Sequence, residues 1–330
     1  MICCPDSESH EEESRISQLN AELKKTYEAL SGGITFESFE SIKSEQIGEL
    51  ALAWSEGREP KYDFAPGTVL SKDPNEWNER YYITFNDSPF VVPAQLKVRR
   101  SELHSHIAHL FRNVWAKEQQ SFQYWYDLER FGFQGYLGKA LVRSKKERIE
   151  AMIAYRLDAE ISLEQLERVL PSFAENLLAS LQHIMRFPHD GTERSAEERD
   201  RLEAEFGRAN RIAEAPFVKL QALMFAALAM RARGQKELPD EGTTTDIDTV
   251  AHLLPYCDAM FMDNRCRSLL LDVPKNFRPA GTAKLFSLNI KEQFLDYLRS
   301  IRNGITVEHV VAIREVYGDE HLNGVPAAQA

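Results

Sequence analysis

The chain has 330 residues, of which 43% are hydrophobic, so it is long enough for one large or two ordinary domains with a buried core. Its 40 basic and 51 acidic residues give a net charge of −11, which argues against a protein dedicated to binding duplex nucleic acid through phosphate neutralisation. The four cysteines fit neither a disulfide framework nor a paired-cysteine zinc site, and this favours a reducing, cytoplasmic setting. The longest apolar run, 222–230, is far too short to span a bilayer, and no signal-peptide pattern opens the chain, so we expect no membrane span and no export.

The N-terminal part is predicted to contain the end of a strand and two amphipathic helices. The opening MICCPDSESHEEES passes from an apolar stub into an acid-rich helix start, as a buried strand followed by a helix does. A strand that begins at its first residue has no lead-in sequence, so we expect a preceding segment to be missing. Apolar residues then recur at helical spacing over 16–30 and 36–54, on either side of Gly32 and Gly33.

The middle of the chain is predicted to be mostly helical. Residues 60–74 are expected to form a loop, and the segments 81–85 and 90–92 to form a short hairpin. Helical patterns then cover 101–187 and 193–233. Breaks in these patterns are expected at 132–138, at 188–191 and at Ala215-Pro216.

The C-terminal part alternates between predicted helices and strands. A polar loop over 234–247 precedes elements expected at 248–254 (helix), 257–262 (strand), 265–271 (helix), 283–288 (strand) and 291–301 (helix). Such an alternation is typical of an α/β fold with a parallel sheet. The last ten residues, rich in Gly and Ala, are expected to fray.

Carboxylates stand at both ends of one predicted helix-to-strand unit. Asp248 is expected to open the helix, and Asp263 to follow the end of the strand. Parallel sheets bind ligands beyond the carboxyl ends of their strands, and carboxylates are hard oxygen ligands suited to Mg²⁺ or Mn²⁺. Glu13, one turn inside the acid-rich helix start, is a candidate third ligand. The alternative is local: Asp248 caps a helix, Asp263 starts a turn, and the N-terminal acids interact with the helix dipole.

Two further patterns have simple structural explanations. His106 and His109 share a helical face near His104, but no acidic or cysteine partner accompanies them at a metal-site spacing, which favours an ordinary helix surface. Basic clusters at 97–100 and 143–148 bracket an aromatic-dense segment, 122–136. Single-stranded nucleic acid binds such patterns, but we favour a helical core bordered by long basic side chains.

The segment Asp248–Asp263, DTVAHLLPYCDAMFMD, resembles the C-terminal acidic motif of bacterial PIN-like domain proteins. The opening segment CPDSESHEEES, residues 4–14, is similar to the part of those proteins that carries their second acid. In PIN domains, acids from separated segments bind a divalent metal ion and the protein cuts RNA. The resemblance implies that Glu13, Asp248 and Asp263 are catalytic metal ligands, with Asp246 and Asp258 as neighbours, and that the first strand and its Asp are absent.

The sequence therefore predicts a PIN-like, Rossmann-like α/β fold with a small parallel sheet and a large, mostly helical insertion. The expected parts are 1–60 and 236–305 for the PIN-like domain, 61–235 for the insertion and 306–330 for a tail. The expected function is Mg²⁺- or Mn²⁺-dependent RNA cleavage, inactive if the first acidic strand is missing, with RNA and either an antitoxin or a second copy as partners. The alternative is a helical interaction protein without enzymatic activity, in which the α/β portion is vestigial.

Overall fold

The computed structural model describes residues 4–7, 9–12, 17–71, 93–157, 171–188, 191–234, 238–278 and 283–317. The predicted hairpin over 81–92, the apolar stub at 1–3 and the last ten residues lie outside these ranges. The chain divides into two units, the first comprising 1–257 with 269–282 and the second comprising 258–268 with 283–330. Each unit is described by itself below. Within the described residues, no helix combines the length and the apolar composition needed to cross a bilayer.

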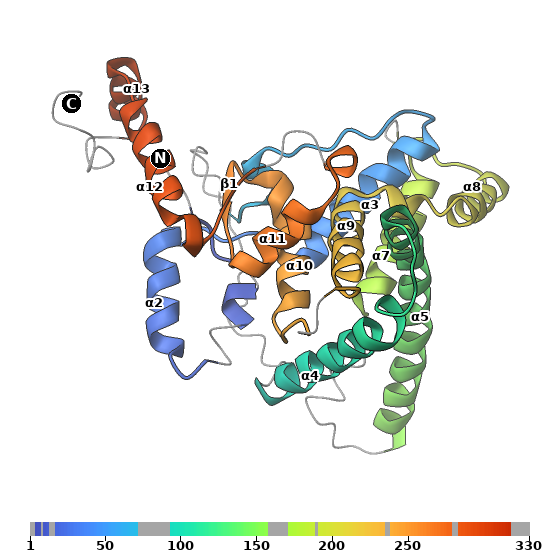
Figure 1. Cartoon of the computed structure of the whole chain (residues 1–330). Coiled ribbons are helices and arrows are strands. Elements are labelled where there is room, and N and C mark those ends of the chain that lie inside the picture. The colour runs from blue at the N-terminus through green and yellow to red at the C-terminus, as the bar shows by residue number, and fades with distance from the viewer. Residues whose placement is uncertain are drawn as a thin grey trace. The chain divides into compact units, whose positions relative to one another are not determined.

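The first unit is mostly helical in its described parts (Figure 1). Its α-helices are α2 (Asn20–Ser31), α3 (Phe39–Ser55), α4 (Pro93–Leu110), α5 (Phe122–Leu157), α7 (Phe173–Arg186), α8 (Ala196–Arg208), α9 (Pro216–Arg231) and α10 (Thr243–Leu253). Shorter helical segments are η1 (Pro66–Val69), the π-helical turn η2 (Phe111–Trp115), η3 (Arg211–Glu214), η4 (Leu254–Tyr256) and η5 (Lys275–Phe277). Helix α11 (Asn264–Asp272) begins in the second unit and ends in the first.

Local sequence explains where several of these helices begin and end. Ser38 begins α3, where its side chain accepts a hydrogen bond from the backbone N–H of Ser41. Ser172 and Glu175 form a reciprocal capping box at the start of α7. Gly32 ends α2 at a φ of 61°, in the left-handed region that glycine adopts at low cost. The predicted stop between the first two helices is therefore confirmed.

Helix α9 is the centre of the core of the first unit. Most of its residues are buried, and it contacts α5, α10 and α3. A helix that is apolar on all sides needs neighbours on all sides, which explains this position. No side chain at its own N-cap accepts a hydrogen bond. Instead, Gln46 of α3 accepts a bond of 2.9 Å from the backbone N–H of Phe217 and donates one of 3.0 Å to the hydroxyl of Tyr256.

Helix α5 corrects one prediction. It runs without interruption over 36 residues, so the break expected at 132–138 is wrong. Glycine costs about 1 kcal/mol relative to alanine in a helix interior, but it does not forbid the helix. Helix α5 contacts α9 and α7, and we attribute its continuity to this packing. The breaks predicted at 188–191 and at Ala215-Pro216 are confirmed, since α7 ends at Arg186 and α9 begins at Pro216.

The second unit contains a two-stranded parallel sheet. Strands β1 (Ala259–Phe261) and β2 (Lys284–Phe286) pair in register, with Met260 opposite Leu285. Its helical segments are the first residues of α11, η6 (Leu288–Ile290), α12 (Lys291–Asn303) and α13 (Val307–Tyr317), the last of which occupies part of the segment predicted as a tail. The predicted strands are confirmed, although both are shorter than expected. The described residues are thus mostly helical with a small parallel sheet, which is compatible with the predicted α/β class.

Candidate functional site

Asp248 lies inside a helix and does not open one. Helix α10 begins at Thr243, so the predicted helix start at residue 248 is wrong. The reason is visible in the burial pattern, because Thr244 and Ile247 already face the core with the same helical spacing as Val250. The hydrophilic sequence TTTDID therefore forms the first turns of the helix instead of a polar loop.

The Asp248 carboxylate is half-buried and accepts a hydrogen bond of 2.5 Å from the Gln221 amide on α9. Burial raises the pKa of Asp248, while the positive charge of Lys43 on α3 and the bond from Gln221 act in the opposite direction. A carboxyl group whose ionised form is disfavoured by burial gains most from a nearby cation. Within the first unit, the positive charge of Lys43 provides part of this stabilisation of the ionised Asp248.

His252 stands one turn after Asp248 on α10 and is completely buried. Its ring lies between the rings of Phe39 and Phe217, at centroid distances of 4.7 and 5.2 Å. Nδ1 lies 2.6 Å from the backbone carbonyl oxygen of Asp248, so Nδ1 carries the proton and donates it. Among the described residues, no group forms a hydrogen bond with Nε2. Burial and the charge of Lys43 lower the pKa of His252 to about 3, so the ring is neutral at ordinary pH.

Sequence reasoning did not single out His252. The available signal was its position four residues after Asp248, which places both side chains on neighbouring turns of one helix. The structure adds the two aromatic rings, which come from segments more than 30 residues away in the sequence. No spacing rule predicts such a contact.

The acid-rich N-terminal segment contacts α10. Ser9 and Thr249 place their hydroxyl oxygens 2.6 Å apart, although 240 positions separate them in the chain. The Thr249 hydroxyl donates to the carbonyl of Thr245, so Ser9 is the donor in this pair. Ser9 is buried, and residues 9–12 are helical as predicted. The segment thus lies against the residue that follows Asp248.

The structure describes two of the acids discussed here, Asp6 and Glu12, together with their partners, but does not describe Glu13. Glu12 is 3.5 Å from Arg100 of α4. Asp6 forms an isolated parallel bridge with Thr35, and its carboxylate is 3.2 Å from His10. The predicted strand end is therefore present as a single bridge within the described residues.

Asp263 belongs to the second unit and is exposed. It follows the end of β1 by two residues, which agrees with its predicted position beyond a strand. Its Oδ1 accepts a hydrogen bond of 2.7 Å from the backbone N–H of Cys266, so it also caps the first turn of α11. The local alternative placed a helix cap at Asp248 and a turn at Asp263, whereas the structure has Asp248 inside α10 and the helix cap at Asp263.

The neighbouring acids have structural surroundings of their own. Asp246 lies in the first turn of α10, and the carbonyl of Asp258 accepts a hydrogen bond from the backbone of Lys284 next to β1. Within the parts of the chain that the structure describes, no three His, Cys, Asp or Glu side chains gather as a metal site would require. Glu13 is not among the residues to which that statement applies. His104 Nε2 donates a hydrogen bond of 3.0 Å to the backbone carbonyl of Pro239, as a helix-surface residue would.

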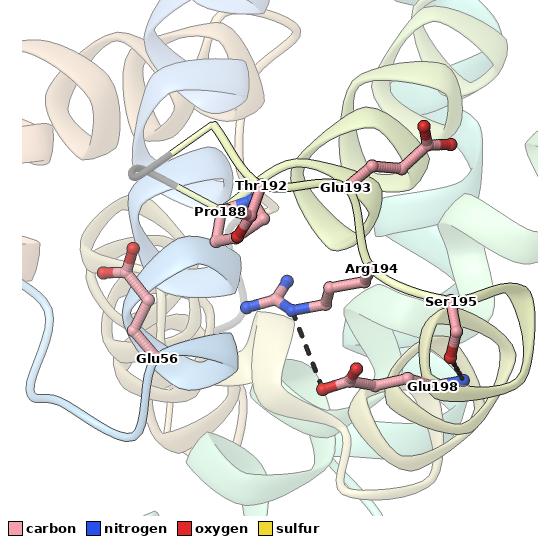
Figure 2. A pocket seen from close by; sticks show the side chains of 7 residues that line it. All are labelled: Glu56, Pro188, Thr192, Glu193, Arg194, Ser195 and Glu198. Carbon is pink, nitrogen blue, oxygen red and sulfur yellow. Dashed lines mark hydrogen bonds and ion pairs between the residues drawn. The ribbon is translucent and has the colours of Figure 1, made fainter.

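An open pocket in the first unit contains none of the candidate acids. Figure 2 shows its lining: Glu56, Pro188, Thr192, Glu193, Arg194, Ser195 and Glu198. Arg194 lies 4.0 Å from Glu198, and its guanidinium also donates to the backbone carbonyls of Met185 and Ser55. These bonds tie the chain before α8 to the ends of α7 and α3. We attribute a structural role to Arg194.

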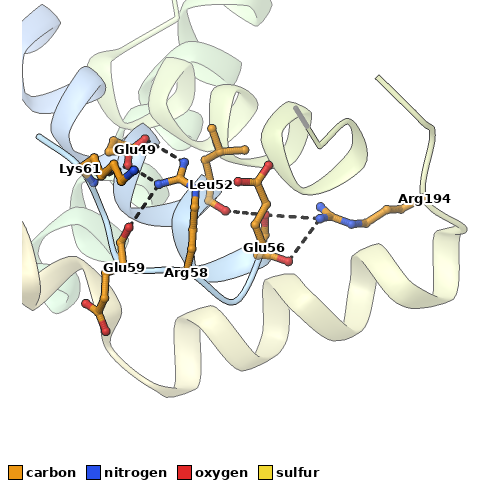
Figure 3. A network of polar contacts seen from close by, with 8 residues as sticks. Glu49, Leu52, Glu56, Arg58, Glu59, Lys61 and Arg194 are labelled. Atoms are coloured by element: carbon orange, nitrogen blue, oxygen red, sulfur yellow. Dashed lines mark hydrogen bonds and ion pairs between the residues drawn. The ribbon is translucent and has the colours of Figure 1, made fainter. Parts of the chain in front are cut away.

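A second polar network lies at the C-terminal end of α3 (Figure 3). Arg58 binds Glu49 with two nitrogens, at 2.6 and 3.2 Å, and binds Glu56 at 2.7 Å. Glu49 also accepts a hydrogen bond from the backbone N–H of Lys61. The bond from Arg58 lowers the pKa of Glu49. Glu49 and Glu56 are both bound to Arg58, and this network therefore fixes the loop after α3.

Comparisons of the chain with protein-family models, with curated proteins and with solved structures found no match.

Proposed function

We propose that this protein is a divalent-metal-dependent ribonuclease of the PIN-like type, with Glu13, Asp248 and Asp263 as ligands of Mg²⁺ or Mn²⁺. The observation that carries the proposal is the contact between Ser9 and Thr249, because it joins the N-terminal acidic segment to the helix of Asp248. These are the two segments on which the resemblance to PIN-like proteins depends.

Two features of individual acids also support the proposal. Asp263 follows the carboxyl end of a strand in a parallel sheet, where ligands of α/β proteins bind. Asp248 has a pKa raised by burial, and a cation bound to it would favour the ionised form. Carboxylates are hard oxygen donors that suit both metal ions. A bound metal ion would supply an activated water and would stabilise charge on the phosphate.

Metal binding gives a test that does not depend on activity. Isothermal titration with MnCl₂ and with MgCl₂ should show binding to the full chain, and Asp248→Asn and Asp263→Asn should each weaken it by about tenfold or more, equivalent to about 1.4 kcal/mol. Asp296→Asn on α12 is the matched control, since Asp296 is exposed and its partner is Arg299 one turn away. Binding that is equal in all four proteins would contradict the proposal.

Cleavage is measured separately with a labelled single-stranded RNA in the presence of Mn²⁺. The same two variants should lose cleavage, while Asp296→Asn keeps it. A protein that binds the metal ion but does not cleave RNA would support the proposed metal site and contradict the proposed ribonuclease activity.

The second candidate function is a helical interaction protein without a metal site. The hydrogen bond from the Cys266 N–H to Asp263 favours it, because this bond gives Asp263 a purely structural task. Asparagine caps a helix as well as aspartate does. Under this alternative, Asp263→Asn therefore behaves as the wild type in every assay, whereas the nuclease proposal requires it to lose metal affinity while keeping its stability.

A further inference from the structure

The buried imidazole of His252 has one nitrogen that can accept a ligand. The side chain is completely buried, and Nδ1 donates its proton to the backbone carbonyl of Asp248 at 2.6 Å. Nε2 therefore carries a lone pair, and no residue in the described part of the chain donates a hydrogen bond to it. A buried polar atom without a partner costs about 1–3 kcal/mol. Binding of a ligand at Nε2 would remove this cost.

The neighbours of His252 hold its ring in one orientation. The rings of Phe39 and Phe217 stack on the imidazole at interplanar angles of 9° and 21°, and the bond from Nδ1 fixes its rotation. Histidines that bind metal ions are held in the same way, because one ring nitrogen donates to a carbonyl or a carboxylate while the other binds the ion. His252 has this arrangement in the protein without a metal ion.

Asp248 provides a second ligand on the same helix. Residues three or four apart lie on one helical face, and metal-binding side chains of helical proteins use these spacings. Oδ1 of Asp248 accepts a hydrogen bond from Gln221, whereas no described residue bonds to Oδ2. Asp248 is only half-buried, so an ion can reach this carboxylate from the solvent.

One positive charge acts on both side chains. Lys43 of α3 lowers the pKa of Asp248 and the pKa of His252, so both groups lie within the range of its ammonium group. The ammonium group is also 5.8 Å from the centre of the Phe173 ring. Within the described residues, Asp248 has one hydrogen-bond donor and no ion pair. A buried carboxylate in such surroundings is stabilised by a bound cation.

We propose that Nε2 of His252 is a ligand of the divalent ion assigned to Asp248, and that the site therefore selects Mn²⁺ over Mg²⁺. This inference rests on the proposed function. Mg²⁺ is a hard ion that binds oxygen atoms, whereas first-row transition ions accept imidazole nitrogens as well as carboxylates.

Pulsed electron paramagnetic resonance of the full chain loaded with Mn²⁺ tests the nitrogen ligand directly. A coordinated imidazole nitrogen modulates the electron spin echo of Mn²⁺ at nitrogen nuclear frequencies. The wild type should show this modulation, and this measurement does not require a variant to fold. His252→Asn should lose it, while the matched control His104→Asn on α4 should keep it, because His104 binds the carbonyl of Pro239.

Isothermal titration gives a second readout. His252→Asn should bind Mn²⁺ at least about tenfold more weakly than the wild type but Mg²⁺ equally well, since an imidazole contributes little to a Mg²⁺ site. Lys43→Gln should bind Mn²⁺ more tightly, because the substitution removes a positive charge that repels the ion. Circular dichroism should show the same helix content in all of these proteins.

The outcomes separate this inference from the proposed function. Mn²⁺ binding that depends on Asp248 but gives no nitrogen modulation would overturn the role of His252 and leave the proposed metal site in place. Weaker Mn²⁺ binding by Lys43→Gln would place the ion away from this charge and would also overturn it. A chain that binds neither Mn²⁺ nor Mg²⁺ would contradict both proposals.

Discussion

Removal of the His252 imidazole should abolish a specific part of the acid sensitivity of this protein. The ring is completely buried between Phe39 and Phe217, and its pKa is lowered to about 3. In the unfolded chain a histidine has a pKa near 6.5. Below pH 6.5 the unfolded state therefore binds a proton that the folded state does not, and stability falls as the pH is lowered towards 3.

The size of this effect follows from the separation of the two pKa values. Each pH unit below 6.5 costs about 1.4 kcal/mol, so His252 should account for about 2 kcal/mol of the stability lost between pH 7.5 and pH 5.0. His252→Asn removes the titration and keeps a side-chain N–H near the position of Nδ1, where it can donate to the carbonyl of Asp248. The variant will be less stable at pH 7.5, because the smaller side chain leaves a cavity.

Urea unfolding followed by tryptophan fluorescence measures the free energy of unfolding of both proteins at pH 7.5 and 5.0. Carboxylates that titrate in this range contribute equally to both, so the difference between the two pH dependences isolates His252. The wild type should lose about 2 kcal/mol more than the variant. Equal losses in the two proteins would refute the assignment of a low pKa to a buried, neutral ring. His109→Asn, at an exposed position, is the control.

Three further predictions concern single side chains. Burial raises the pKa of Glu129 to about 7, so ionisation of this carboxyl group destabilises the folded state as the pH rises from 4.5 through 7. Glu129→Gln should therefore raise the free energy of unfolding by about 1–2 kcal/mol at pH 8 but not at pH 4. A stabilisation of equal size at both pH values would contradict this. Gln46→Ala leaves the N–H of Phe217 and the hydroxyl of Tyr256 without a bonding partner in the core, and should cost roughly 2–4 kcal/mol in urea unfolding, whereas Gln123→Ala at an exposed position should cost little. Asp263→Ala should lower stability by about 1 kcal/mol and Asp263→Ser by much less, because serine also caps helices, and equal thermal midpoints for the two variants would reject the cap.

Local sequence signals predicted the C-terminal elements well. The segment from Asp258 to Asn303 has alternating short apolar runs and polar connections, and the structure contains the expected strands and helices there. Ser38, Gly32 and Pro216 mark helix ends by chemistry that acts within a few residues. Such signals can be read without knowledge of the fold.

The errors arose where packing outweighs local preference. Gly132, Gly135 and Gly138 suggested a break, but tertiary contacts keep α5 helical through them. Polar residues before Asp248 suggested a loop, but Thr244 and Ile247 are buried and extend α10 to Thr243. The setting of His252 depends on rings from α3 and α9, which no local pattern brings together. The metal site remains a prediction, because Glu13 lies outside the described residues.

The two hydrogen bonds of Gln46 limit which fragments of the chain can fold by themselves. One amide group joins α3, the start of α9 and the segment after α10, which are 171 and 210 positions away. A fragment limited to residues 61–235 would contain α9 but neither Gln46 nor Tyr256, and its apolar helix would expose the surfaces that α3 and α10 cover. Expression of the helical middle by itself should therefore yield aggregated material, and the smallest autonomous piece must retain both flanks.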